Sequence, residues 1–393
     1  YGDPATGGPP VRVVGTYGDL PLEYAAIRRG CALFDEPWRA VIEVTGPDRR
    51  EFLNRMITQE LKDLTPGNVR PAFWLNRKGR INADLIVAEL GPQPGPEAGD
   101  RMLMLCDVHS VKSAIDGLNA YIITEDVTLT DRTESLHTLS LHGPTAAKLL
   151  EGIGAAAPGE KSATVTTIAG HSATIVRHDA TGDPGFLILV DGAAAADVFR
   201  TLIEQGHDAA HSEHGGGVTS TNRLAGEVKL RPAGWMAFNM ARIEAGTPLF
   251  NIDFGPESLP AESGVLKDRV SFTKGCYLGQ EVVARMYSRG HSKQELVAVR
   301  FEAVRPIADE APLLPEGGAP RAPEDGEPVG AITSSTLSPM LGAIPIGFAQ
   351  VKQAHKAAGT KLMTTADGQP VSAIVQESLR FWSRSNSGGS AGN

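Results

Sequence analysis

The sequence predicts an α+β protein in which antiparallel sheets carry helices on one face and a small β-barrel follows. The chain has 393 residues, which is too long for a single core. Strand-like and helix-like segments alternate in a loosely repeated order, and two antiparallel α+β layers explain that order better than parallel βαβ winding. The last part of the chain carries short strand-like runs punctuated by Gly and Pro, as in a small barrel.

The first α+β layer is predicted from residue 18 onward. Residues 18–29 (GDLPLEYAAIRR) carry a helical pattern, and residues 40–46 (AVIEVTG) alternate like a strand that ends in a Gly-Pro turn. The segment PDRREFLNRMI has apolar residues at helical spacing. The run RPAFWLNRKGRINADLIVAEL predicts a hairpin whose turn lies near residues 77–79, and the strand RMLMLCDV and the helix HSVKSAIDGLNAYI follow it.

The second layer repeats this order with the strand HTLSLHG, the helix PTAAKLLEGI, the strands SATIVRH and FLILVD, and the helix AAADVFRTLIEQ. The segment HDAAHSEHGGGVTSTN predicts a flexible connection, and the Pro-rich, acidic residues 304–328 predict a second long loop. We expect five regions in all. Residues 11–135 form a first α+β lobe, 136–215 a second lobe, and 216–295 a third lobe that contains the Lys-Gly-Cys (KGC) motif at 274–276. Residues 296–385 form the β-barrel, and 386–393 form a disordered tail.

Composition narrows the class of function. The formal net charge is -9 and the acidic residues are scattered, which argues against an extended nucleic-acid footprint. No apolar run reaches the length of a membrane span, and the first residues lack a signal-peptide pattern, so we expect a cytoplasmic protein without a membrane partner. Three cysteines far apart argue against a disulfide framework.

Metal and nucleotide motifs are weak or missing. His207, His211 and His214 have a spacing that could present imidazoles on a helix, but the glycines that follow favour a solvated loop, so we predict no metal site. Neither a GxxxxGK[ST] nor a GxGxxG segment follows a strand. Three isolated cysteines also fall short of the four thiolates that an iron-sulfur cluster usually takes.

The segment TKGCYLGQEVVARMYSRG raises the question of what Cys276 does. Gly275 and Gly279 bracket it, and a helix is predicted directly after it. The positive end of that helix, together with Lys274, would favour the nucleophilic thiolate. The alternative is that Cys276 is a buried small residue while Glu281 and Arg285 form an ordinary i, i+4 pair. Spacing alone leaves both interpretations open.

A second candidate lies in PAGWMAFNMARIEAGTPLFNIDF. Gly246 is a natural C-cap and Pro248 stops the helix, so we expect it to end near Ala245. Arg242 suits this last turn, whereas the carboxylate of Glu244 opposes the helix dipole and should have a partner. A carboxylate in an apolar cleft can hold adjacent N–H groups of a planar heterocycle. A solvent-facing glutamate is the other interpretation.

Together these segments resemble the folate-binding YgfZ family, relatives of the glycine-cleavage aminomethyltransferase, or T-protein. KGCYLGQE at 274–281 resembles the signature K-G-C-[FY]-x-G-Q-E, and RIEAGTPLF with the downstream LPAE resembles an R-x-E-A-G-x-P segment shared with T-protein. Further similar landmarks are VTGPDRREFLNRM, LHGPTAAKLL, TGDPGFLILV and TSSTLSPMLG. The resemblance covers roughly residues 17–352.

The resemblance implies an aminomethyltransferase-like ring of three lobes around a tetrahydrofolate site, with a C-terminal barrel. It implies that Glu244 holds the pteridine edge and that Lys274 and Cys276 line the functional face. The wider folate-binding set that it suggests is Glu244, Arg242, Tyr277, Gln280 and Arg285. Members of the family support assembly or repair of iron-sulfur clusters in client enzymes, such as radical-dependent tRNA thiolation factors.

One departure from T-protein concerns the acids of the first hairpin. T-protein typically reads G-G-I-x-D-D-L-I-V, whereas this chain reads GRINADLIV, with Ala83 at the first acid and Asp84 at the second. Aminomethyl transfer needs a carboxylate near the folate N5, and Asp84 can still serve as a catalytic group.

Three functions therefore stay open: cluster maintenance through Cys276 and Lys274, a folate-dependent aminomethyl- or methyltransferase that uses Asp84, and a non-catalytic scaffold that senses folate. A cysteine hydrolase would need a base near the thiol. His291, the nearest candidate in sequence, lies beyond the predicted helix, and the sequence does not place it within hydrogen-bond reach of Cys276, so this function is disfavoured.

Overall fold

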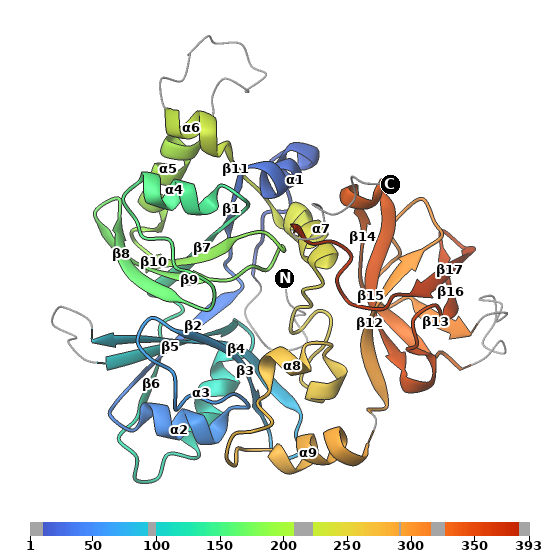
Figure 1. The fold of residues 1–393 in the computed structure, drawn as a ribbon, viewed down its shortest axis with the longest axis horizontal. Helices are drawn as coiled ribbons and strands as arrows, with labels where there is room; N and C mark the ends of the chain where they lie inside the picture. Colours follow the sequence, from blue (N-terminus) through green and yellow to red (C-terminus); the bar gives the residue numbers. More distant parts are fainter. Residues whose placement is uncertain (1–10, 93–99, 208–222, 291, 316–326, 385–393) are drawn as a thin grey trace, which may run out of the picture. The chain divides into compact units, whose positions relative to one another are not determined.

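A computed structural model of the chain describes residues 11–92, 100–207, 223–290, 292–315 and 327–384 (Figure 1). Contacts between Cα atoms divide it into two units. Unit 1 comprises Tyr1–Ala72 and Asp84–Phe238, and unit 2 comprises Phe73–Ala83 and Asn239–Asn393. The tip of the first hairpin thus belongs to unit 2. In the described residues, no helix combines the length and apolar character that crossing a bilayer requires.

The first sheet of unit 1 contains five strands in the order β3-β4-β5-β2-β6. Apolar runs bounded by turn signals produce these strands, and the central ones are buried on both faces. The turn of the β3–β4 hairpin lies where the sequence predicts it. Helices α2 and α3 cover one face of this sheet (Figure 1). The bounds are β2 Arg39–Thr45, β3 Val69–Leu75, β4 Ile81–Pro92, β5 Asp100–Asp107, β6 Thr128–Asp131, α2 Arg49–Met56 and α3 Val111–Asn119.

The second sheet contains six strands in the order β11-β1-β7-β10-β9-β8. Its β1–β11 pair is parallel and joins two distant parts of the chain, with Cys31 opposite Leu230. Helices α4 and α5 pack on the sheet, and α1 contacts β1 and β11. The bounds are α1 Leu20–Arg29, β1 Cys31–Asp35, β7 Leu136–His142, α4 Ala146–Gly152, β8 Ala163–Ile168, β9 His171–Arg177, β10 Gly185–Asp191, α5 Ala195–Gly206, α6 Arg223–Val228 and β11 Leu230–Pro232.

The period-2 alternation of the strands builds two cores in unit 1. Leu187 and Leu189 of β10 face the first sheet, where they join Val41, Leu103 and neighbouring side chains. Phe186, Ile188 and Val190 alternate with them and face α4 and α5, whose contributing residues include Leu149, Val198 and Leu202. Unit 1 is therefore layered as helices, sheet, sheet, helices, with apolar cores between the layers.

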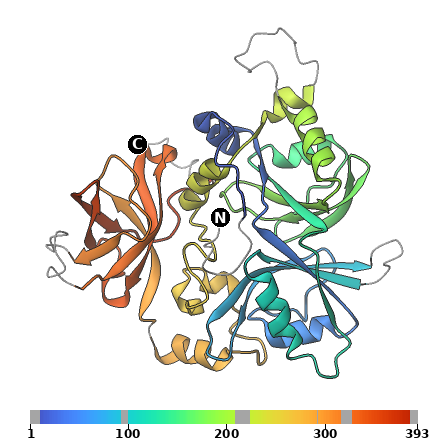
Figure 2. The same cartoon turned by 180° about the vertical axis from the view of Figure 1, so that it is seen from behind.

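Unit 2 continues from α7 through short helices into the barrel (Figure 2). Helix α7 ends at Ala245, as predicted, and Gly246 adopts a left-handed φ of 77°. The helices that follow are η3 Pro260–Glu262, α8 Leu266–Arg269 and α9 Gln280–Arg289, and α7 itself spans Trp235–Ala245.

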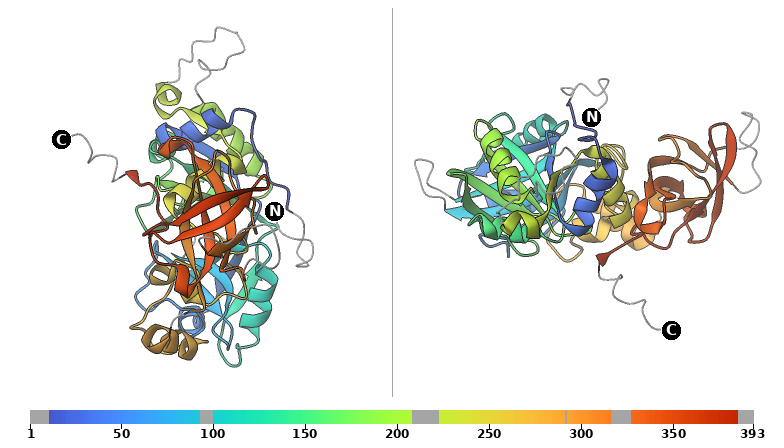
Figure 3. Two further views of the ribbon diagram at one scale, coloured as in Figure 1. Left: turned by 90° about the vertical axis from the view of Figure 1, so that its right-hand side faces the viewer. Right: turned by 90° about the horizontal axis from the view of Figure 1, so that it is seen from above.

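The six barrel strands close in the order β12-β15-β14-β13-β16-β17 around their own apolar core (Figure 3). Closure leaves no strand edge without a neighbour, which protects small sheets from edge-to-edge association. The bounds are β12 Gln294–Phe301, β13 Pro312–Pro315, β14 Gly330–Ser338, η4 Pro339–Leu341, β15 Ile344–Lys352, η5 Gln353–His355, β16 Lys361–Ala366 and β17 Gln369–Val375.

The structure confirms the predicted fold class of antiparallel sheets with a C-terminal barrel. The sequence expectations did not include the strands β1, β6, β8, β11, β12, β13 and β16. The predicted boundaries at 135, 215 and 295 stay predictions. Several predictions fall on residues that the structure does not describe: most of the connection around 207–222, the residues His211, His214 and His291, and the tail 386–393.

Candidate functional site

The KGC turn, defined here as residues 270–279, places the thiol of Cys276 at the surface between two anchored side chains. Lys274 and Tyr277 are both 7% exposed, whereas Cys276 is exposed. Tyr277 packs in an apolar cluster that includes Val270, and burial raises the pKa of its phenol to about 12. The Nζ atom of Lys274 lies 5.2 Å from the centre of the Tyr277 ring. The turn is therefore built into the core of unit 2 on both sides of the thiol.

Cys276 differs from the other two cysteines in its access to solvent. Cys31 and Cys106 are buried, and burial raises the pKa of each thiol well above its usual range. A thiol must be accessible and must ionise to act as a nucleophile or metal ligand. Of the three free cysteines, only Cys276 meets the requirement of access.

Two glycines let the first hairpin and the KGC turn approach each other closely. Gly279 has a φ of 82°, and a Cβ atom there would lie 2.7 Å from the carbonyl oxygen of Asn76. Gly79 has a φ of 73°, and a Cβ atom there would lie 2.7 Å from the Cβ of Val282. Glycine is thus required twice at one contact inside unit 2. The Arg77-Lys78-Gly79 tip lies against the start of α9.

The remaining predicted residues of the motif lie on α9. Gln280 is its first residue and is half-buried, and Arg285 is exposed one turn further on. The rings of Phe272 and Tyr287 stack with their centroids 4.0 Å apart, and Tyr287 is 66% exposed. Lys274, Cys276, Tyr277 and Gln280 therefore belong to one local structure, as their sequence proximity predicts.

Arg242 lies on α7 and is completely buried. Its Nη1 donates to Asp253 Oδ2 at 2.7 Å and to the Thr247 carbonyl, and its Nη2 donates to Ser334 Oγ at 2.7 Å. Its Nε donates to Asn239 Oδ1 at 2.8 Å. These bonds attach α7 to strand β14 of the barrel. Whether Arg242 also contacts folate stays a prediction.

Glu244 has the partner that its position in the last turn of α7 requires. Its Oε1 accepts from Ser338 Oγ at 2.5 Å and from the Met340 amide at 3.2 Å. Its backbone carbonyl accepts from the amides of Phe381 and Trp382, both at 2.9 Å. The side chain is 0% exposed, so it is a joint between α7 and the barrel. Its predicted contact with a pteridine stays a prediction.

Asp84 belongs to unit 1, where it is half-buried on β4. Its charge is one of those that, together with burial, raise the pKa of the Cys106 thiol; the charges of Asp107 and Asp131 contribute more. Ala83 beside it is 0% exposed. Asp84 is thus on a rigid strand near other acids, and its catalytic role is a prediction.

Unit 1 contains a buried polar network that the sequence pattern did not predict. Glu36 is 0% exposed, accepts from Ser140 Oγ at 2.5 Å and pairs with Arg39. Although burial opposes its ionisation, Arg39, His142 and Ser140 hold the pKa of Glu36 well below its usual value. His142 lies edge-on to Phe34 and Phe238. The residues of this network come from segments about 100 residues apart that meet only in the folded chain. The spacing of residues in the sequence therefore could not predict the network.

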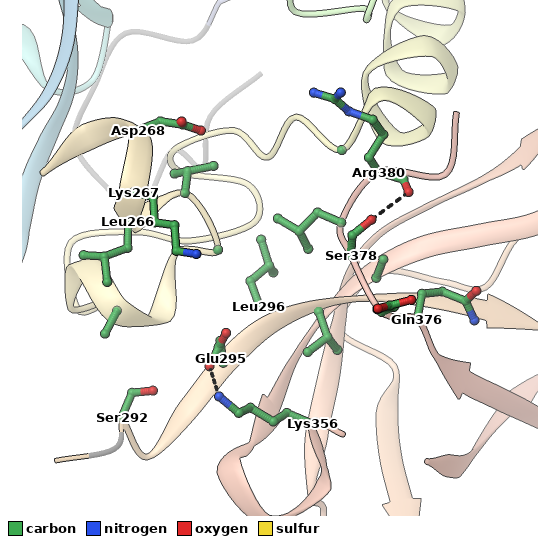
Figure 4. Close-up of a pocket in the computed structure, with 18 of the residues that line it drawn as sticks. Leu266, Lys267, Asp268, Ser292, Glu295, Leu296, Lys356, Gln376, Ser378 and Arg380 are labelled. Atoms are coloured by element: carbon green, nitrogen blue, oxygen red, sulfur yellow. Dashed lines mark hydrogen bonds and ion pairs between the residues drawn. The ribbon is translucent and has the colours of Figure 1, made fainter. Parts of the chain in front are cut away.

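A cavity of about 970 Å³ lies within unit 2 (Figure 4). Leu266 and Leu296 contribute apolar walls, Lys267 points toward the space between α8 and β12, and the Glu295–Lys356 ion pair of 2.5 Å lies at one side. None of the residues predicted from sequence to form the site lines this cavity. In the described residues, no group of three or more His, Cys, Asp and Glu side chains is placed to hold a metal.

Comparisons with known proteins agree with this architecture. An aminomethyltransferase of Streptomyces coelicolor is 28% identical over 349 residues, covering 88% of this chain and 84% of the relative. One of Synechococcus sp. is 25% identical over 368 residues, covering 91% and 89%.

The crystal structure of glycine cleavage system aminomethyltransferase T from Bartonella henselae has the same fold. Its TM-score is 0.77 at 22% identity, covering 94% of this chain and 92% of that one. The family description "GCVT N-terminal domain" matches residues 19–226, and "Glycine cleavage T-protein C-terminal barrel domain" matches residues 299–381. This chain therefore belongs to the GCVT family.

Proposed function

We propose that this chain is a cytoplasmic tetrahydrofolate-binding protein that supports assembly or repair of iron-sulfur clusters in client enzymes through the thiol of Cys276. The observation that carries the proposal is the exposure of Cys276 between the buried Lys274 and Tyr277. This arrangement fixes a soft sulfur ligand at the surface, where a second protein can reach it.

The role of Cys276 in cluster chemistry is that of one ligand among several. Clusters usually take four thiolates, and Cys31 and Cys106 are buried. A cluster that contacts Cys276 would therefore be shared with a client protein, which supplies the other ligands. Folate is the substrate or effector that links this role to the family, since the relatives are named aminomethyltransferases.

Complementation of a deletion strain tests the thiol. We expect Cys276→Ser, which keeps the size of the side chain, to fold normally and to fail to restore the activity of cluster-dependent client enzymes. Gly275→Ala is the matched control, because a Cβ atom there meets nothing within 4 Å. Full restoration of client activity by Cys276→Ser would remove the thiol from the proposal.

Anaerobic calorimetry with tetrahydrofolate tests the ligand. The wild-type protein should bind it saturably, and Glu244→Gln examines the predicted pteridine contact with less damage to the buried joint than Glu244→Ala, because it keeps the size and the hydrogen-bonding capacity of the side chain. We expect Glu244→Gln to bind tetrahydrofolate more weakly than the wild type. A folded wild type that binds no tetrahydrofolate would overturn the folate part of the proposal.

A second candidate function is aminomethyl transfer to tetrahydrofolate from an aminomethylated carrier, whose carbon is already at the oxidation level of formaldehyde. The free carrier and ammonia leave as the methylene carbon becomes bonded to two nitrogens of the folate. The names of the relatives favour it over cluster maintenance, and Asp84 supplies a carboxylate on a rigid strand. Formation of methylene-tetrahydrofolate, lost in Asp84→Asn and retained in Cys276→Ser, is the result expected for this function. The reverse dependence, on Cys276 and not on Asp84, is expected for cluster maintenance.

A further inference from the structure

A second cleft, of about 340 Å³, lies entirely within unit 1, where the end of α1 meets β11. It is separate from the KGC turn, and neither the family descriptions nor the names of the relatives refer to it. Its lining residues come from the last two turns of α1, the end of α5 and the segment before and within β11. We call it the α1–β11 cleft; it is lined by Leu22, Ala25, Ala26, Arg29, Gly30, His207, Lys229, Leu230 and Arg231.

The charged side chains of the cleft all have the same sign. Arg29, Lys229 and Arg231 line it, and no carboxylate is among the lining residues. In the described part of the chain, none of these three side chains forms a hydrogen bond or an ion pair. The neighbouring Arg28 behaves differently, since it is buried and its Nη1 pairs with Asp183 at 2.8 Å. Arg28 is thus part of a buried ion pair, whereas Arg29 lines the cleft.

The backbone brings these cations together by a close and strained approach. A Cβ atom on Gly30 would lie 2.8 Å from the carbonyl oxygen of Lys229, so only glycine permits this contact. Lys229 itself has a φ of 54°, a left-handed conformation that is unfavourable for a residue with a long side chain. Directly after it, Leu230 pairs with Cys31 across the parallel β1–β11 ladder.

His207 adds a fourth nitrogen-bearing side chain at the cleft. Its Nδ1 lies 3.0 Å from the carbonyl oxygen of Leu230, and a carbonyl can only accept, so Nδ1 carries the proton. This bond orients the ring on β11. The alternative explanation is that the cations only stabilise the negative C-terminal end of the α1 dipole. This explains Arg29, which lies in the last turn of α1, but not Lys229 and Arg231, which lie on another segment.

We propose that the α1–β11 cleft binds a small organic dianion, either a phosphate ester or a dicarboxylate. Arg29, Lys229 and Arg231 contact the anionic groups, because guanidinium and ammonium groups give charge-assisted hydrogen bonds to both chemistries. Leu22, Ala25 and Leu230 form the apolar wall for the body of the ligand. The volume lies within the range of small-molecule sites.

Calorimetric titration of the full chain tests the proposal with phenyl phosphate, glutarate and inorganic phosphate as probes. The site variant is Arg29→Gln with Lys229→Gln. The control variant, Arg12→Gln with Lys62→Gln, removes the same charges from exposed positions of unit 1 that do not line the cleft. Circular dichroism verifies that both variants are folded.

We expect saturable binding of phenyl phosphate or glutarate by the wild type and the control, weakened about 10-fold for each cation removed in the site variant. Binding should also weaken as salt is added. Preference for one probe identifies the anion as a phosphate ester or a dicarboxylate. Inorganic phosphate binding as tightly as phenyl phosphate would overturn the role of the apolar wall. Failure of both organic probes with the wild type, or equal losses in the two variants, would overturn the proposal.

Discussion

At the scale of single residues, the buried charges are held by partners that lie far away in the sequence. Arg242 reaches Ser334, and Glu244 reaches Ser338. Sequence reasoning found that Glu244 needed a partner, because its charge opposes the helix dipole. It had no means to find which partner, since a joint between α7 and β14 is a tertiary contact. The need of Glu244 for a partner was thus predictable from its position, whereas the identity of that partner was not.

Glu36 should make stability depend on pH. Its pKa is lowered from the usual 4.5, so its contribution is present above pH 4.5 and is lost as the pH falls further. We expect Glu36→Gln to lower the free energy of unfolding at pH 7 by about 3 kcal/mol, because Arg39 loses its buried partner. Urea denaturation at pH 7 and at pH 3 measures this, and the difference from wild type should be smaller at pH 3, which lies well below the unfolded pKa.

The control for Glu36 is Glu51→Gln, since Glu51 is 76% exposed in its pair with Arg55. It should change stability by less than about 0.5 kcal/mol at either pH. Equal effects of the two substitutions would show that the buried network contributes nothing.

Asp253 should be a major determinant of the joint between α7 and the barrel. Its carboxylate pairs with Arg242 and accepts from Ser334 Oγ at 2.6 Å. We expect Asp253→Asn to cost about 3 kcal/mol, because the buried guanidinium loses its counter-charge. Thermal denaturation provides the measurement. Asp367→Asn, which breaks an ion pair between exposed side chains, should leave the midpoint nearly unchanged.

At the scale of elements, local signals predicted what local interactions determine. The end of α7 followed from Gly246 and Pro248, and the turn of the β3–β4 hairpin followed from its composition. Strand β1 was missed, because its pairing with β7 and β11 depends on segments more than a hundred residues away. Strand β13 was missed because it lies inside a Pro-rich segment that has the composition of a loop.

The β8–β9 hairpin turn is open to stabilisation. Ile168 pairs with His171, so Ala169 and Gly170 form the loop, with φ values of 54° and 81°. The β16–β17 hairpin has Asp367 and Gly368 in the same conformation, which suits Asp-Gly better than Ala-Gly. We expect Ala169→Asn to raise the free energy of unfolding by about 0.5–1 kcal/mol in urea denaturation. A decrease would contradict this explanation of the turn.

Substitution of Gly279 should disturb the structure of the KGC turn more than substitution of Gly275. A methyl group at Gly279 meets the Asn76 carbonyl and must occupy a left-handed conformation, at a cost of about 1–3 kcal/mol. We expect Gly279→Ala to lower the melting midpoint and to change the rate at which Cys276 reacts with Ellman's reagent. Gly275→Ala should preserve the melting midpoint. Identical behaviour of the two variants would mean that the close approach does not position the thiol.

At the scale of the whole molecule, the division into units does not follow the order of the chain. Phe73, Leu75 and Ile81 come from the first hairpin yet belong to the apolar cluster of Tyr277 and Val283 in unit 2. The sequence predicted lobes in linear order, because composition reveals linkers but not a hairpin tip that packs into a core built by a later segment.

A fragment of residues 239–393 should therefore fail to form a native KGC turn. It lacks three side chains of the cluster, each of which contributes about 1.5–3 kcal/mol when buried. The barrel core is complete within the fragment, so β-sheet circular dichroism should persist. We expect the Tyr277 phenol to titrate closer to its usual value of 10 than to about 12. An unchanged phenol titration would show that the hairpin tip is dispensable.

Cys31 and Cys106 are buried whereas Cys276 is exposed, and this difference has a practical consequence. A maleimide fluorophore or nitroxide added to the unaltered protein should attach at one position, without removal of the other cysteines. Fluorescence anisotropy or electron paramagnetic resonance would then report from the KGC turn alone, and each candidate client or folate could be examined by the same probe.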